Sequence, residues 1–91
     1  MSFTISFTGQ FKKDYKVIVK RKYDLTKLEM VYKILEETGT LPITKYKTHI
    51  LKGNYAGNYE AHIEPDWLLI WIKEKTEIIF VRTGTHSDLF K

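Results

Sequence analysis

The 91-residue sequence contains no cysteine, and this absence excludes several kinds of site. Without thiols there is no disulfide framework, no thiolate metal site and no cysteine nucleophile. Long apolar runs are also absent: the longest, WLLIWI at residues 67–72, is far shorter than the roughly 20 residues that span a bilayer. The opening MSFTISFTG lacks the cationic segment and apolar block of a signal peptide. We therefore expect a soluble cytoplasmic protein without a membrane partner.

The composition indicates a folded protein with a basic surface. Hydrophobic residues make up 43% of the chain, enough to form one core. The net charge of +4 favours polyanions as partners but does not establish nucleic-acid binding. The positive charge is concentrated in residues 12–22, which contain a single acid beside Lys12, Lys13, Lys16, Lys20, Arg21 and Lys22. Because acids gather in 35–39 and 73–77, one end of the molecule should be distinctly positive.

The first half of the chain has the pattern of one strand and two helices. FTISF (3–7) alternates apolar and polar residues, as a half-buried strand does. Apolar residues at helical spacing predict one helix over 11–23 and a second that starts after Asp24, a residue type that caps helix N-termini. Gly39, followed by Pro42, marks the end of the second helix. The two helices should form an antiparallel hairpin.

The second half of the chain predicts an antiparallel meander. After a polar, irregular stretch at 43–60 come three strand-like runs, at 59–63, 67–73 and 77–82, joined by short connections. The middle run is apolar on both faces, so it should lie in the centre of the sheet. The expected fold class is therefore α+β: an N-terminal strand, a two-helix hairpin packed on one sheet face, and the meander. Residues 1–91 should form a single domain.

Several polar residues should meet at one edge of this sheet. Adjacent antiparallel strands with a short connection bring the end of one strand next to the start of the other. The residues that this rule places at one edge are His62, Asp66, Trp67, Arg82 and His86. His49 precedes LKGNY and is close enough in sequence to reach the same edge, although periodicity does not place it there.

Each of these residues also has an ordinary structural explanation. A single histidine at a strand end is more often a surface residue than a catalyst, and Asp66 stands at a common turn position. Trp67 can belong to the core, and the lysines can form a solvated helix face. Arg82 can pair with Glu60 or Glu64. Taken one at a time these explanations are favoured, but they do not account for three histidines and an arginine on the same side of the sheet.

Histidines, a carboxylate, an arginine and an aromatic residue are the groups that metal-free RNA cleavage uses. Attack of a 2′-hydroxyl on the adjacent phosphate needs a general base, the leaving 5′-oxygen needs a general acid, and an arginine stabilises the charge of the transition state. Histidine titrates near neutral pH and serves either proton role, while an exposed aromatic ring can stack on a base. No two histidines are three or four residues apart, so we expect neither a metal site nor a cofactor.

Three blocks of the sequence resemble the YafQ branch of the RelE/ParE toxin superfamily. They are YDLTKLEMVYKILEETGTLP, YKTHILKGNYAGNYEAHIEPDWLLIW and RTGTHSDLF, and the similarity runs from the opening strand to Phe90. The resemblance implies a RelE-like microbial ribonuclease fold. It also implies a type II toxin that acts as an mRNA interferase, a ribosome-dependent endoribonuclease that cuts translated mRNA in the ribosomal A site and so arrests translation.

The resemblance further implies which residues act. The functional positions of YafQ-like toxins correspond here to His49, His62, Asp66, Arg82, His86 and Phe90. His86 would be the proton donor and Arg82 would stabilise the transition state, while the general base is left open among the other two histidines and Asp66. Phe90 would pack against or stack on a base, and Trp67 would touch the RNA or only pack. The basic residues that would meet ribosomal RNA are Lys12, Lys13, Lys16, Lys20, Arg21 and Lys22.

The resemblance implies a partner as well as a target. A toxin that stops its host's translation needs an antitoxin, and we expect an acidic, DinJ/RelB-like protein that folds onto the basic surface. The antitoxin would bind DNA through its own N-terminal part, so the toxin would meet DNA only indirectly. The targets would be the 70S ribosome and mRNA.

Two alternatives remain open at this point. One is a non-catalytic, ParE-like toxin that binds a protein target such as gyrase, and the other is a general RNA-binding module or a nuclease that acts on free RNA. The first alternative has no need of three histidines together with Asp66 and Arg82.

Overall fold

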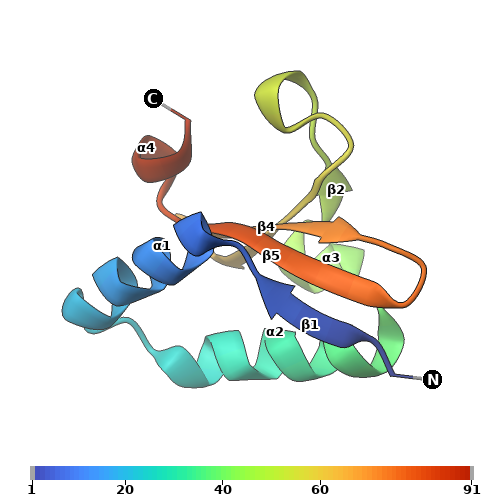
Figure 1. Cartoon of the computed structure of the whole chain (residues 1–91). Coiled ribbons are helices and arrows are strands. Elements are labelled where there is room, and N and C mark those ends of the chain that lie inside the picture. Colours follow the sequence, from blue (N-terminus) through green and yellow to red (C-terminus); the bar gives the residue numbers. More distant parts are fainter. Residues whose placement is uncertain (1, 91) are drawn as a thin grey trace.

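The computed structural model describes residues 2–90, which form a five-stranded sheet with helices on both sides (Figure 1). Residues 1 and 91, the two ends of the expected domain, lie outside the described part. The elements in chain order are β1 (Thr4–Phe7), α1 (Gly9–Lys20), α2 (Leu25–Thr38), α3 (Ile43–Tyr46), β2 (His49–Ile50), the 3₁₀ helix η1 (Gly53–Tyr55), β3 (Tyr59–Glu64), β4 (Trp67–Lys73), β5 (Glu77–Gly84) and α4 (His86–Leu89). The expected α+β class is confirmed. Within the described residues no helix is long and apolar enough to cross a membrane.

The N-terminal strand and the two helices form as the sequence predicts. α1 begins earlier than expected because Thr8 caps it, its hydroxyl accepting the N–H of Phe11 at 2.9 Å. Asp24 caps α2, and its carboxylate accepts the N–H of Thr26 at 3.1 Å. Gly39 ends α2 in the left-handed conformation, with φ of 76°, where the ring of Phe3 leaves no room for a side chain.

The sheet has the strand order β1-β5-β4-β3-β2. β1 is parallel to β5, and the other neighbours are antiparallel. The apolar strand β4 lies in the centre, as expected. Its side chains alternate: Trp67, Leu69 and Trp71 belong to the larger core, whereas Leu68 and Ile70 form a second cluster with a residue of α4. Both faces of the central strand are therefore covered.

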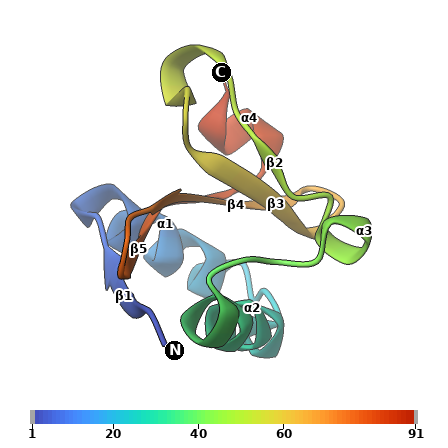
Figure 2. The ribbon, with the colours of Figure 1, turned by 90° about the vertical axis from the view of Figure 1, so that its right-hand side faces the viewer.

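The two long helices and the C-terminal helix lie on opposite sides of the sheet. α1 and α2 occupy one side, and α4 and the loop between β2 and β3 rise from the other (Figures 1 and 2). The larger core includes Phe11 and Ile18 of α1 and Val31 and Leu35 of α2, which confirms that both helices pack on one face. The opposite face has the smaller cluster, so polar side chains have room to gather there.

The stretch 43–60 is less irregular than its sequence predicts. It contains α3, β2 and η1, and β2 pairs with β3 so that His49 lies opposite Glu60. A strand of two residues is too short to produce a periodic pattern, which is why the sequence does not reveal it. Its consequence for the site is large, because this pairing brings His49 into the sheet.

A register shift between β4 and β5 turns Arg82 to the open face. Ile70 pairs with Arg82 and Trp71 pairs with Phe80, so Val81 is the extra residue of a bulge. In a regular strand Arg82 would share the face of Phe80, which is buried in the core that the long helices cover. Because residues paired across strands point to the same face, the bulge places Arg82 on the side of Ile70.

The last described residues form α4, a helix that the sequence pattern did not predict. Thr85 caps it and completes a capping box with Asp88. Arg21, just after α1, donates two hydrogen bonds of 2.7 and 3.1 Å to the carboxylate of Asp88. These hydrogen bonds attach α4 to the C-terminal end of α1.

Candidate active site

The candidate site covers the open face of the sheet as well as the strand ends where Asp66 and His86 lie, so strand counting predicted only part of its position. One row of paired residues crosses four strands in the order His49, Glu60, Ile70 and Arg82. His62 lies two residues beyond Glu60 on the same strand, and therefore on the same face. The expected end of β5 at Arg82 was also wrong, since the strand continues to Gly84. Register gathers His49, Glu60, His62 and Arg82 on this face. The ends of the strands bring Asp66 and His86 together, as expected.

The three histidines follow one another across this face. The ring centroids of His49 and His62 are 6.5 Å apart, and those of His62 and His86 are 5.7 Å apart. Between the first two lies the carboxylate of Glu60, whose Oε1 is 3.2 Å from Nε2 of His49 and 3.7 Å from Nε2 of His62. The side chain of Glu60 is only 6% exposed, so the two imidazoles provide most of its polar contacts. The cluster can exchange a proton among several coupled groups.

The carboxylate of Asp66 holds His86 in place. Its Oδ1 accepts from the backbone N–H of His86 at 2.9 Å and lies 2.6 Å from Nδ1 of the ring. The backbone hydrogen bond first, and the side-chain hydrogen bond second, lower the pKa of Asp66 below its ordinary value. With Nδ1 bound to a carboxylate, Nε2 of His86 is directed away from the carboxylate and can face a substrate.

Arg82 forms a two-point ion pair with Asp14 of α1, and not with Glu60 or Glu64. Its Nε and Nη2 donate to the carboxylate at 2.8 and 3.1 Å. The remaining nitrogen, Nη1, lies 3.4 Å from the hydroxyl of Tyr55. The hydrogen bonds to Asp14 raise the pKa of Arg82 further above its ordinary value, so the guanidinium is always charged.

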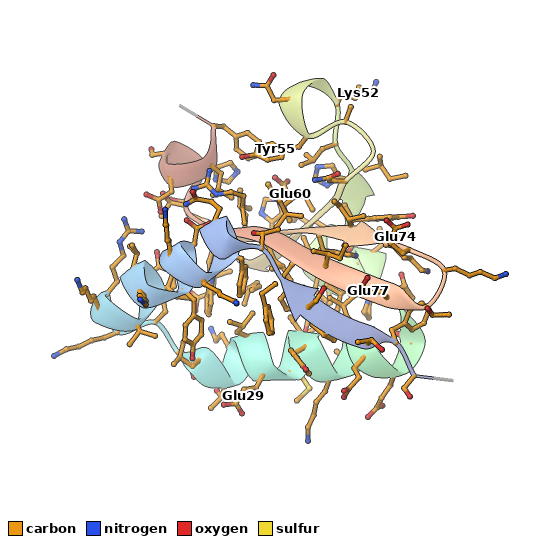
Figure 3. The ribbon with its side chains drawn as sticks, in the orientation of Figure 1. Glu29, Lys52, Tyr55, Glu60, Glu74 and Glu77 are labelled. Atoms are coloured by element: carbon orange, nitrogen blue, oxygen red, sulfur yellow. The ribbon has the colours of Figure 1, made fainter. Side chains whose placement is uncertain are left out.

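Aromatic rings close the site on the side of α4. Phe90 is 44% exposed, and its ring lies edge-on to Tyr55 at 5.8 Å and 6.5 Å from the ring of His86. Figure 3 shows Tyr55 and Glu60 on the side of the sheet that carries α4. An exposed phenylalanine beside an imidazole and a tyrosine is a surface on which a base can stack.

Trp67 is part of the core, so of the two roles considered for it, RNA contact or packing, the structure favours packing. The side chain is 1% exposed, and its Nε1 donates to the hydroxyl of Thr83 at 2.9 Å. Tyr23 packs edge-on against the indole at 4.8 Å. The indole has no free face on which a base can stack.

The basic residues expected to meet RNA are all exposed, but they face different parts of the molecule: Arg21 lines a small pocket together with Arg82, whereas two of the lysines do not. Lys12 and Lys16 line a groove between α1 and α2, on another side of α1 than Asp14, which points to Arg82. Arg21 already has a partner in Asp88. Contact between these residues and ribosomal RNA stays a prediction.

Three residues of the site were missed by the sequence reasoning. Asp14 is the only acid in the basic segment 12–22, a signal that a charge partner is needed nearby. Glu60 is two residues before His62, so strand periodicity places both on one face. Tyr55 belongs to the short turn η1, where no periodic pattern exists.

The fold and the site first define a class: a small α+β protein similar in structure to bacterial toxins of toxin–antitoxin pairs. A chain in the crystal structure of the Escherichia coli DinJ–YafQ toxin–antitoxin complex has a TM-score of 0.89 and 37% identity, with full coverage of both chains. A metal-bound toxin from Helicobacter pylori has a TM-score of 0.86 and 39% identity, covering 97% of this chain and 99% of that one. Within residues 2–90, no group of three or more histidine, aspartate or glutamate side chains is placed to hold a metal ion.

The sequence comparisons then define the family. The model for the bacterial toxin of the type II toxin–antitoxin system, YafQ, matches residues 3–91. The mRNA interferase toxin YafQ of Escherichia coli strain K12 is 42% identical over 87 residues, 94% of either chain. The chain belongs to the YafQ toxin family, which confirms the resemblance seen in the sequence.

Proposed function

We propose that this protein is the toxin of a type II toxin–antitoxin system and an endoribonuclease that cuts translated mRNA in the A site of the 70S ribosome. The observation that carries the proposal is the His86–Asp66 pair next to His62, with His49 and Arg82 on the same sheet face. The 42% identity to an mRNA interferase toxin supports the same reaction. A cytoplasmic location follows from this target.

In the proposed reaction one part of the site acts as the general base and another part acts as the general acid. The 2′-oxygen attacks the adjacent phosphorus while its proton passes to the cluster of His49, Glu60 and His62. The bond from phosphorus to the 5′-oxygen breaks, and protonated His86 gives that oxygen its Nε2 proton. Asp66 stabilises the imidazolium and fixes its orientation, so it acts with the acid and not with the base. The products are a 2′,3′-cyclic phosphate and a free 5′-hydroxyl.

Arg82 and the aromatic rings serve the substrate. A permanently charged guanidinium stabilises the negative charge that gathers on the phosphate oxygens in the transition state. Phe90, half-exposed on the last turn, is placed to stack on a base next to the scissile phosphate. No metal ion is needed for any step of this reaction.

The test is cleavage of mRNA bound to purified 70S ribosomes, mapped by primer extension. His86→Ala should slow cutting by roughly 10²- to 10⁴-fold, and Arg82→Ala by roughly 10²- to 10³-fold. Glu37→Gln, an exposed change on α2, is the matched control and should cut like the parent. Variants that cut as fast as the parent would overturn the proposed roles.

Three further arms of the same assay separate the alternatives. Cutting that persists when a chelator removes transition metals, while Mg²⁺ is kept to hold the 70S ribosome together, supports a reaction without a bound transition metal. Loss of cutting that returns with a transition-metal ion contradicts it. Equal rates of cutting for free RNA and for ribosome-bound mRNA would show that the reaction does not depend on the ribosome. A parent that cuts no RNA but inhibits gyrase would establish a ParE-like binder instead.

We also propose an antitoxin partner of the DinJ/RelB type with an acidic, amphipathic segment. The support is a groove of about 810 Å³ between α1 and α2, lined by aromatic residues of β1, α1 and α2. It is bordered by the two lysines Lys12 and Lys16 of α1 and by Lys33, Glu29 and Glu36 of α2. An apolar helix face fits such a groove, and acidic flanks fit the two lysines. The DinJ–YafQ complexes of Escherichia coli support the kind of partner.

The antitoxin proposal is tested by the affinity of the chain for the protein encoded in the neighbouring reading frame. The double change Lys12→Glu and Lys16→Glu should weaken binding and make it less sensitive to salt, because two attractive charges become repulsive. Lys45→Glu and Lys75→Glu together, outside the lining of the groove, serve as the control for net charge. Equal weakening by both double variants would show that overall charge, not the groove, attracts the partner.

A further inference from the structure

α1 replaces a missing strand at the outer edge of β5. β1 pairs with β5 only as far as Phe80, after which the chain turns into α1. The N–H of Thr8 then donates to the carbonyl of Phe80 at 3.0 Å, and its hydroxyl donates to that of Val81 at 2.8 Å. Further along the edge, the carboxylate of Asp14 accepts the N–H of Thr83 at 3.1 Å. Without these contacts the last residues of β5 would have unpaired backbone groups.

The carboxylate of Asp14 accepts four hydrogen bonds at this edge. Besides the N–H of Thr83, it accepts from Nε and Nη2 of Arg82 and from Nε2 of Gln10 at 3.0 Å. The residue is only 8% exposed, so these four donors, and not water, compensate its charge. The edge of β5 and the side chain of Arg82 are therefore fixed by one group.

The two-point pair determines which part of Arg82 remains available. Nε and Nη2 face Asp14, whereas Nη1 meets only the hydroxyl of Tyr55 at 3.4 Å, the long end of the range for a hydrogen bond. A phosphate oxygen can replace the weak contact to Tyr55 without breaking the ion pair. The bulge at Val81 and the carboxylate of Asp14 together hold the guanidinium on the open face of the sheet.

We propose that Asp14 is a positioning residue, which acts through Arg82 by fixing the guanidinium with Nη1 toward the scissile phosphate. This inference rests on the proposed function and names a residue of the same site that touches no substrate atom. A free arginine side chain has many rotamers, and the ion pair removes that freedom before the substrate arrives. Asp14 also keeps the guanidinium paired between reactions, so the charge is never buried alone.

The test is a double-mutant cycle on the cutting rate at saturating ribosome complex. Asp14→Asn keeps the shape of the side chain but places an amide where Arg82 and Thr83 need an acceptor, so kcat should fall by about 10²-fold, the loss typical of a small misplacement. In the Arg82→Ala background the same change should alter kcat by less than about twofold, because nothing remains to position. Gln10→Ala, which removes a donor to Asp14 but no contact to Arg82, is the matched control and should stay within about threefold of the parent. An equal loss in both backgrounds would overturn the inference.

A second measurement does not depend on the reaction. In the parent, the Nε–H of Arg82 should exchange slowly with solvent in NMR spectra, because it is bonded and partly buried, and Asp14→Asn should accelerate the exchange by about tenfold or more. An unchanged exchange rate would contradict the positioning role, even if the Asp14→Asn variant cuts RNA slowly. If the parent cuts no RNA but the exchange arm gives the expected result, the proposed function fails while the fixing of Arg82 by Asp14 stands.

Discussion

Single side chains satisfy the polar groups that the core of this small protein would otherwise leave unpaired. The hydroxyl of Thr83 accepts from Nε1 of Trp67 at 2.9 Å and donates to the carbonyl of Leu68 at 2.6 Å, and the residue is 1% exposed. Both partners lie on β4, so one hydroxyl links the two central strands through side chains as well as through the ladder. A buried donor or acceptor that loses its partner costs the free energy of its desolvation.

Thr83→Val tests this link at the scale of one atom. Valine fills the same space but offers neither donor nor acceptor, so the indole N–H is left buried and unpaired. The free energy of unfolding, measured by urea titration, should fall by about 1–3 kcal/mol. Thr4→Val on the exposed side of β1 is the control, with a change within about 0.5 kcal/mol. A smaller loss for Thr83→Val than for the control would contradict the link.

The residue types and their positions in the predicted strands are sufficient to predict some of the site residues but not all of them. Acid–base chemistry could be inferred from His62, Asp66 and His86 because their side chains have few other uses in combination. Asp14 and Glu60 could not be assigned, because a carboxylate in a helix or strand has many ordinary roles until its neighbours are known. Their burial, at 8% and 5% exposed, is what distinguishes them.

Among the elements, the long periodic ones follow from the sequence and the short ones do not. α1, α2 and β4 have enough residues to show their period, and each was predicted. β2 and α4 are too short to do so, although they place His49 and His86. The bulge in β5 gives no sequence signal either, because the run from Ile78 to Arg82 reads as a regular strand. Strand counting therefore predicted that β5 lies next to β4, but neither the face of the sheet on which Arg82 lies nor its contacts with Asp14 and Tyr55.

Gly84→Ala tests the connection between β5 and α4. Gly84 has φ of 149°, a region open to glycine, and an added Cβ would lie 2.7 Å from Oδ2 of Asp88. The substitution should displace α4 and with it His86, so cutting should fall by about 10²-fold or more while the core stays folded. Gly9→Ala, where a Cβ meets no atom within 4 Å, should leave cutting unchanged. Equal rates for the two variants would mean that α4 tolerates displacement.

The docking of α4 should weaken in acid. Hydrogen bonds from Arg21, and then those with Thr85, hold the pKa of Asp88 well below its usual range. A carboxyl whose pKa is lowered on folding stabilises the fold at pH values above its ordinary pKa of about 3.9. That contribution is lost as the pH falls through the folded-state pKa. Because Arg21 is 40% exposed, solvent screening limits the contribution to about 1 kcal/mol or less.

Urea titrations between neutral pH and strong acid measure this contribution. Asp88→Asn and Arg21→Gln remove the same ion pair, so each should flatten the fall in stability below about pH 4 by a similar amount. A fall as steep in both variants as in the parent would assign the acid sensitivity to other carboxyls.

At the scale of the whole molecule, the sheet separates two kinds of surface. The side covered by α1 and α2 contains the larger core and the apolar groove bordered by lysines, whereas the other side contains the histidines and Arg82. A net charge of +4 adds an attraction to polyanions that no single residue explains. The apolar groove and the histidine cluster therefore face different directions.

Replacing Lys12, Lys16 and Lys20 by alanine tests whether α1 contacts ribosomal RNA. If all three lysines meet phosphates, affinity for the 70S ribosome should fall, and the slope of log K against log salt should decrease by about 0.7–0.9 for each phosphate that no longer meets a lysine. The cutting rate at saturating protein should stay near that of the parent, because none of the three touches the site. Unchanged affinity would show that these lysines do not contact ribosomal RNA, and would leave Lys12 and Lys16 as residues of the groove.

The parallel pairing of β1 with β5 has a consequence for the order in which the protein is made. A ribosome synthesises a chain from its N-terminus at roughly 5–20 residues per second, so β1 waits several seconds for its neighbour. Arg82 lies on β5, and His86 and Phe90 follow it. Neither the complete sheet nor the site can form before β5 and α4 have been synthesised. A nascent chain that stops short of β5 therefore has an unpaired β1 and none of these three side chains, and the same segment completes both the sheet and the site.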